Sequence, residues 1–125
     1  MTPTELKAWT FEVAVRVVKF VEVLPHEPRS WVLGKQLLRS GTSVGAQYRA
    51  ACRAQSARDF ISKMKKMEEE ADESVLWLAL LRATGLSESL AKESERLESE
   101  YDRLTAIAVS SSKTAERRAA RAAKH

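Results

Sequence analysis

Proline is confined to the first quarter of this chain, and that restriction limits the possible folds more than any other feature of the sequence. The three prolines are Pro3, Pro25 and Pro28, so the 97 residues that follow contain none. Only four glycines occur in all 125 residues. Because proline and glycine interrupt helices more strongly than any other residues, the sequence predicts long helices joined by short connections.

Four segments carry apolar residues at the three- and four-residue spacing of amphipathic helices. The expected helices run from about residue 3 to 23, from 28 to 53, from 57 to 84 and from 88 to 112. Short connections make successive helices antiparallel neighbours. We therefore predict an all-α fold, an antiparallel up-and-down four-helix bundle formed by residues 1–112.

Residues 113–125 form a separate basic tail. Five of them are Lys or Arg, Glu116 is the one acid, and none carries a large apolar side chain. A segment that contributes nothing to a core has little to hold it in place. We expect this tail to be disordered, or at most loosely helical.

The second expected helix contains three glycines, Gly34, Gly41 and Gly45, on the same face as Cys52. Each glycine inside a helix costs about 1 kcal/mol relative to alanine. The sequence therefore predicts that a neighbouring helix approaches this face closely. We expect Cys52 to be a small buried residue of the same face.

The end of the third helix, residues 75–81, is apolar all round. A helix with no polar face needs cover on more than one side, and a four-helix monomer covers only one. The sequence thus predicts a homo-oligomer. The residues placed in the subunit interface are Phe11, Val18, Leu76, Trp77, Leu80 and Leu81.

Groups suited to catalysis or metal binding are scarce. The single cysteine excludes an intramolecular disulfide and a cysteine-built zinc site, and His26 and His125 lie far apart in the sequence. Residues 68–73 are acidic, but di-metal sites in helical bundles use Glu-x-x-His pairs, and no histidine follows here. We expect Glu69, Glu70 and Glu73 to point away from the core into solvent, and Glu68, at the edge of the apolar stripe, to be available to an arginine of another helix. The sequence predicts a non-enzyme with no cofactor and no metal.

No stretch approaches the ~20 apolar residues that a membrane-spanning helix needs. The first residues include Glu5 and Glu12, where a secretory signal would carry basic and then apolar residues. We expect a cytoplasmic protein with no membrane partner.

Charge is distributed unevenly along the chain, whose formal net charge is +4. Residues 1–67 contain 12 Lys/Arg and 5 Asp/Glu, whereas residues 68–112 contain 4 and 11. One interpretation is that helices pair by opposite charge, within a chain or between subunits. The other is a nucleic-acid surface on the basic part.

The candidate nucleic-acid surface consists of basic residues from the second and third helices and the tail. Such groups can neutralise phosphates and give salt-sensitive, largely sequence-blind binding. Trp31 is the one aromatic residue near them that could stack on a base. The basic residues are Lys35, Arg39, Arg49, Arg53, Arg58, Lys63, Lys65, Lys66, Arg117, Arg118 and Arg121.

The most distinctive stretch of the sequence is QLLRSGTSVGAQYRAA, residues 36–51. The motifs that accompany it are Leu24-Pro25, Ser56, Asp59-Phe60-Ile61, the EEADES of residues 69–74 and the WLALL of residues 77–81. Over roughly residues 5–108 the chain resembles the bacterial four helix bundle protein family. That family includes the 23S rRNA intervening-sequence proteins and is related to accessory proteins of diversity-generating retroelements.

The resemblance implies a bundle that assembles into a ring, commonly a pentamer, without an established enzymatic activity. It also implies polar contacts between helices for Arg39, Ser40, Ser43 and Glu73, and family members carry asparagine where this chain has Gln47. The family's association with ribosomal RNA and retroelements suggests RNA, or nucleic acid together with a protein partner. The expected function is therefore RNA binding by a homo-oligomer. The alternative is a protein–protein scaffold or adaptor ring with no nucleic-acid role.

Overall fold

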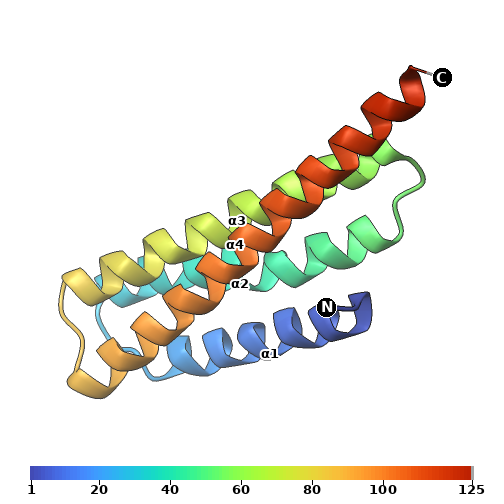
Figure 1. The fold of residues 1–125 in the computed structure, drawn as a ribbon. Helices are drawn as coiled ribbons and strands as arrows, with labels where there is room; N and C mark the ends of the chain where they lie inside the picture. Colours follow the sequence, from blue (N-terminus) through green and yellow to red (C-terminus); the bar gives the residue numbers. More distant parts are fainter. Residues whose placement is uncertain (125) are drawn as a thin grey trace.

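The computed structural model describes residues 1–124 and places four α-helices in them (Figure 1). They are α1 (Pro3–Glu22), α2 (Pro28–Cys52), α3 (Ala57–Ala83) and α4 (Glu88–Ala123). α1 packs on α2, α2 on α3 and α3 on α4, while α1 and α4 contact each other less extensively. The predicted all-α, up-and-down four-helix bundle is confirmed. Within the described residues, no helix is both long and apolar enough to cross a membrane.

The helices begin and end where side chains satisfy the terminal backbone groups. The hydroxyls of Thr2, Ser56 and Ser87 each accept a hydrogen bond from the backbone N–H three residues on, at 3.1, 3.0 and 3.3 Å. Pro28 occupies the first position of α2, where no N–H is needed. Gly85 follows α3 with φ +116°, a conformation that favours glycine. These local signals fix short turns and hence the antiparallel order of the helices.

The core runs along the axis between the four helices. The inward-facing residues of α4 from Ser94 to Ala108, which are three or four positions apart, are completely buried. Leu81 is also completely buried, three residues after Leu78 on the same inward stripe of α3. The prediction that Leu81 lies at a subunit interface is therefore wrong. The largest fully buried side chains are Tyr101, Leu37, Met64, Met67, Leu78, Leu81, Leu97 and Leu104.

The glycines of α2 allow close packing, as predicted. A Cβ at Gly41 would lie 2.7 Å from Tyr101 Oη, and one at Gly45 would lie 3.0 Å from Thr10 Oγ1. The Tyr101 hydroxyl donates to the Gly41 carbonyl oxygen over 3.1 Å, and burial raises the pKa of Tyr101. Cys52, predicted to be buried, is instead exposed because α2 ends at this residue.

Gly41→Ala is expected to destabilise the chain by about 1–2 kcal/mol, because overpacking against Tyr101 outweighs the gain in helix propensity. In the Tyr101→Phe background, which removes the hydroxyl, the same substitution should be neutral or stabilising. Urea unfolding of the parent chain, the two single variants and the double variant measures the coupling free energy between positions 41 and 101. An equal effect of Gly41→Ala in both backgrounds would contradict this explanation.

The tail differs from its prediction: residues 113–123 are helical, as the continuation of α4, and not disordered. Alanine and arginine favour helices, and no glycine or proline interrupts them. The segment also contacts α3, where Lys65 Nζ lies 3.3 Å from Glu116 Oε1. Thr114, Ala115 and Ala119 are partly covered, and the other residues of 113–124 are exposed. Figure 1 shows these last turns of α4 projecting well beyond the start of α1.

Candidate nucleic-acid interface

The antiparallel fold gathers positive charge at one end of the bundle. The last turns of α2, the first turns of α3 and the last turns of α4 all lie there (Figure 1). Residues 49–66 contain six Lys/Arg and one acid, and residues 113–124 contain five and one. We call this region the basic end. Its cations are Arg49, Arg53, Arg58, Lys63, Lys65, Lys66, Lys113, Arg117, Arg118, Arg121 and Lys124.

Nine of the eleven predicted nucleic-acid residues lie in the basic end, and Lys35 and Arg39 do not. Lys35 lies in the first half of α2, beside a hollow that Trp31 and His26 also line near the α1–α2 turn. A helix of 25 residues is about 37 Å long, so one face of α2 spans both ends of the bundle. A residue on the basic face of α2 therefore does not necessarily lie in the basic end.

Ion pairs engage some cations of the basic end. Lys63 Nζ lies 3.4 Å from Asp59 Oδ1, and Lys65 pairs with Glu116 as described. Exposed pairs of this kind contribute little to stability and exchange readily with solvent ions. Within residues 1–124, six exposed arginines of the basic end make no ion pair: Arg49, Arg53, Arg58, Arg117, Arg118 and Arg121.

A hollow between α2 and α3 lies within the basic end. Gln47 of α2 lines it together with Arg58, Lys63, Lys65 and Lys66 of α3. Sequence reasoning did not place Gln47 in the site, although the resemblance had singled out its position. Its amide can donate a hydrogen bond to a phosphate oxygen.

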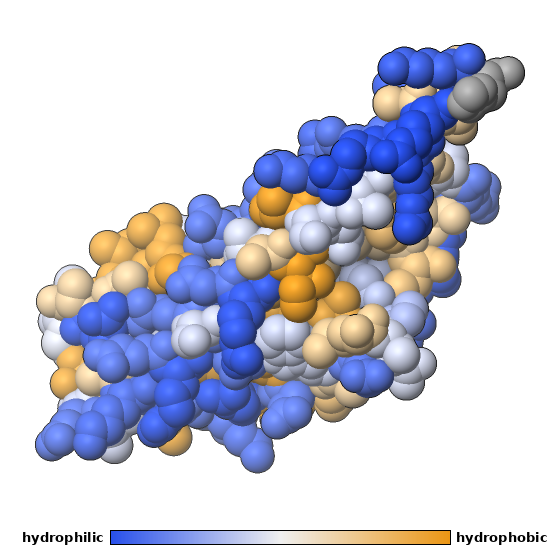
Figure 2. Space-filling model, viewed as in Figure 1, coloured by the Kyte–Doolittle hydropathy of each residue, from blue (hydrophilic) through white to orange (hydrophobic). Residues whose placement is uncertain are grey.

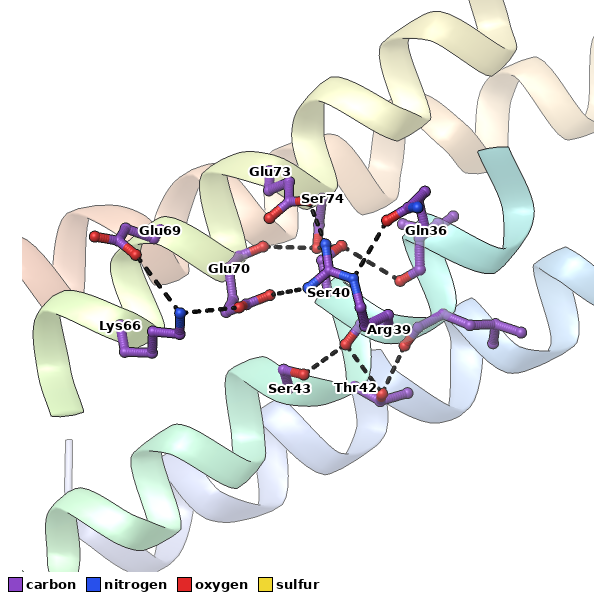
Figure 3. A network of polar contacts seen from close by, with 12 residues as sticks. Gln36, Arg39, Ser40, Thr42, Ser43, Lys66, Glu69, Glu70, Glu73 and Ser74 are labelled. Carbon is purple, nitrogen blue, oxygen red and sulfur yellow. Dashed lines mark hydrogen bonds and ion pairs between the residues drawn. The ribbon is translucent and has the colours of Figure 1, made fainter. Parts of the chain in front are cut away.

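Arg39 belongs to a polar network that joins α2 to α3 (Figure 3). Its Nη1 lies 3.2 Å from Glu70 Oε2, and its Nη2 bonds the carboxylate of Glu73. Its Nε donates to Gln36 Oε1 over 3.3 Å. The side chain of Glu70 is only 8% exposed, and Lys66 Nζ is the other cation near it, at 4.0 Å. Both terminal nitrogens of the Arg39 guanidinium are therefore bonded to carboxylates, and its Nε to an amide oxygen.

The same network continues through serine hydroxyls. Ser40 Oγ and Ser74 Oγ lie 2.8 Å apart between the two helices (Figure 3). Ser43 donates to the Arg39 carbonyl within its own helix, over 2.6 Å. The inter-helix role that the resemblance implies is confirmed for Arg39, Ser40 and Glu73, but not for Ser43. The prediction of a solvated Glu70 is wrong, because the side chain of Arg39 covers it.

Elsewhere, opposite charges pair within the chain. Arg16 Nη2 donates to Glu93 Oε1 across the α1–α4 seam over 2.9 Å, and this bond raises the pKa of Arg16. Arg82 forms a two-bond pair with Glu98 between α3 and α4, at 2.8 and 2.9 Å. Such pairing was one of the two interpretations of the charge pattern. It accounts for charges around the first turns of α4, away from the basic end, and leaves six arginines of the basic end without an ion pair within residues 1–124.

Apart from Leu81, the predicted interface residues lie in two groups on different surfaces. On α1, Phe11 is 71% and Val18 38% exposed; on α3, Leu76 is 50% and Leu80 37% exposed. Trp77 is half-buried beside them. Figure 2 shows apolar surface where the C-terminal half of α3 lies, and polar surface over the first half of α4 and over the tail. Two different patches suit a head-to-tail contact between subunits.

Within residues 1–124, no three His, Cys, Asp or Glu side chains are grouped so as to hold a metal ion. His125, which sequence reasoning treated as an isolated histidine, lies outside the described residues.

Comparison with known proteins identifies a protein family and similar solved structures. Residues 4–110 match the model of the family described as 23S rRNA-intervening sequence protein. A protein of unknown function from the S23 ribosomal protein family of Bacteroides thetaiotaomicron VPI-5482 is 35% identical, with a TM-score of 0.80. The match covers 90% of this chain and 99% of that one. No curated protein sequence is significantly similar.

Proposed function

Because the chain belongs to the 23S rRNA-intervening sequence protein family, we propose that it is a non-enzymatic, homo-oligomeric bundle that binds RNA through its basic end. The observation that carries this proposal is the set of exposed arginines at one end of the bundle that make no ion pair within residues 1–124. The family name supplies the link to ribosomal RNA. The charge alone supports phosphate binding of any kind.

Arginine suits this role because its planar guanidinium can bind a phosphate through two hydrogen bonds. Contacts to phosphate position a nucleic acid but carry no sequence information. Trp31 is 63% exposed, but it lies beside Lys35 near the α1–α2 turn and not in the basic end. We therefore propose recognition of the RNA backbone, without base stacking on Trp31.

The second candidate is a protein–protein scaffold ring with no nucleic-acid role, which the two exposed apolar patches favour. In such a ring the basic end of one subunit would be covered by acidic residues of the next. The first half of α4 is rich in glutamate and offers such a surface. The two candidates differ in whether the arginines of the basic end are accessible in the assembly.

Fluorescence anisotropy with a labelled RNA hairpin and with a DNA duplex of equal length tests the proposal. We expect the affinity for RNA to fall about 100-fold between 50 and 200 mM salt if roughly four phosphates are contacted. The RNA hairpin should bind more tightly than the DNA duplex. No binding of either at 50 mM salt would leave the scaffold as the function, and equal binding would remove the preference for RNA.

Leu76→Glu is expected to convert the oligomer to a monomer, because it places a charge in an apolar patch that a second subunit would cover. Light scattering coupled to gel filtration measures the mass. Val23→Glu is the matched control, since Val23 is 63% exposed but lies outside both patches, and its mass should stay that of the parent chain. A monomeric parent chain at micromolar concentration would contradict the proposed assembly.

A further inference from the structure

Two adjoining hollows lie at the basic end, one with a largely apolar wall and one with a mixed wall. One lies between the first turns of α3 and the last turns of α4, from Ala57 and Phe60 to Ala122. The other lies beside the start of α1, where Leu6 and Ile107 line it. Phe60 and Ser111 line both hollows. The two hollows therefore adjoin at Phe60 and Ser111, and together we call them the α3–α4 trough.

The trough exists because α1 is shorter than the helices it covers. α1 begins at Pro3, which faces Ile107 across the second hollow. Beyond that point α3 and α4 continue as a pair, and α1 no longer packs over them. From residue 107 to 122, α4 runs for about 24 Å, the length of a helix of roughly four turns. One more helix laid in the trough would continue the bundle core.

The charge around the trough indicates what kind of helix fits. Lys7 and Arg118 line it, and neither makes an ion pair within residues 1–124. Arg58, which adjoins Ala57 in sequence, is also free, and Arg121 lies one turn beyond Arg118. Of the acids next to lining residues in sequence, Asp59 and Glu116 are each paired with a lysine, and Glu5 accepts a hydrogen bond from the Thr2 hydroxyl. The surroundings of the trough are therefore strongly positive.

We propose that the α3–α4 trough binds an acidic amphipathic helix of a partner protein. The apolar face of that helix would pack on Phe60 and on the small side chains of α4, and its carboxylates would pair with Lys7 and Arg118. A second copy of this trough would bring the same positive charge and would be repelled. The match to the family ends at residue 110, so most of the α4 wall lies beyond it. The proposal does not rest on RNA binding.

The packing of such a helix would be close. Ala115 and Ala119 are four residues apart on α4, so they lie one above the other along the trough. Short side chains at these positions let a partner backbone approach, while Phe60 provides a larger apolar surface at the centre. The partner helix is expected to present leucine or alanine at three- and four-residue spacing.

The probe is a labelled synthetic peptide of sixteen residues, with leucines along one helical face and glutamates flanking them. Ala119→Gln fills the trough, and Ala120→Gln makes the same change at the neighbouring exposed position that does not line it. We expect the peptide to bind the parent chain, to bind Ala119→Gln about tenfold more weakly, and to bind Ala120→Gln as it binds the parent. A peptide with lysine in place of every glutamate should not bind.

Equal peptide affinities for Ala119→Gln and Ala120→Gln would overturn the proposal, as would a failure of the glutamate peptide to bind the parent. If Ala119→Gln alone abolished a concentration-dependent self-association in sedimentation experiments, the occupant would be a second copy. If Ala119→Gln weakened binding of the RNA hairpin as much as binding of the peptide, the trough would belong to the RNA site. Thermal unfolding of both variants checks that each is folded.

Discussion

Replacing Arg117, Arg118 and Arg121 together with glutamine is expected to weaken binding of an RNA hairpin about 500-fold at 0.1 M salt. These three arginines are exposed and make no ion pair within residues 1–124, so they are available to phosphates. Each lost phosphate contact removes the release of about one counterion, worth roughly a factor of eight in affinity at this salt concentration. Fluorescence anisotropy of the labelled hairpin measures the change. The salt slope should fall by about 2 to 3 at the same time.

The control removes the same number of charges at other places on the chain. Lys19, Lys35 and Lys92 are exposed and lie outside the basic end. Their joint replacement by glutamine lowers the net charge by the same three units, and we expect the affinity to change by less than about threefold. If both triple variants lost affinity equally, overall charge and not the basic end would be responsible. That result would contradict the proposed site.

Arg39→Met is expected to destabilise the chain by about 3 kcal/mol. The substitution leaves the carboxylate of Glu70, whose side chain is 8% exposed, with Lys66 Nζ at 4.0 Å as its remaining cation. Removing one partner of a buried ion pair is strongly destabilising because the other charge stays buried without compensation. We place the value at the low end of that range because Arg39 itself is 48% exposed. Urea unfolding measures the free energy.

The double variant Arg39→Met/Glu70→Leu separates the buried charge from the loss of packing. Apolar residues can replace a buried ion pair at little cost, so this chain should regain most of the lost stability. Arg39→Met should also leave RNA affinity unchanged, because both carboxylates already occupy the guanidinium. A tenfold loss of RNA affinity in folded Arg39→Met would instead make Arg39 a phosphate ligand, as the sequence pattern suggested.

The helices of this protein could be predicted because their signals are local. Prolines, capping hydroxyls and three- and four-residue spacing each act within a few residues. The glycines of α2 were also informative, because glycine destabilises a helix and is therefore expected where another helix packs closely. Tyr101 and Thr10 are the close neighbours of Gly41 and Gly45. These features depend on neighbours in sequence or on one face of one helix.

The predictions that were wrong concern side chains whose environment depends on the packing of other helices. Glu70 lies on the polar side of α3 in isolation, but Arg39 of α2 covers it. Leu81 belongs to an apolar run, yet only the packed bundle shows that it faces inward while Leu76 and Leu80 do not. The helical tail is a different kind of error, because the helix propensity of its alanines and arginines is local.

The residues of the candidate site could be predicted from the sequence, but their arrangement could not, because it depends on contacts between helices. Sequence reasoning identified the basic residues, but it treated the charge as a division along the chain. Residues 49–66 and 113–124 are far apart in sequence, but the antiparallel order of the helices places both at the same end of the bundle. The basic residues therefore form one region of the bundle and not one half of the chain. Lys35 lies on the same face of α2 as Arg49 but near the other end. Connectivity, not helical periodicity, therefore decides which cations form one surface.

Lysine footprinting by mass spectrometry tests the central claim most directly, because every lysine of the chain is read in one measurement. An amine-reactive reagent labels the protein with and without a saturating RNA hairpin. We predict that RNA protects Lys65, Lys66 and Lys113 and leaves Lys19 and Lys92 as reactive as in the free protein. Equal protection of both sets, or protection of Lys19 and Lys92 alone, would contradict binding at the basic end.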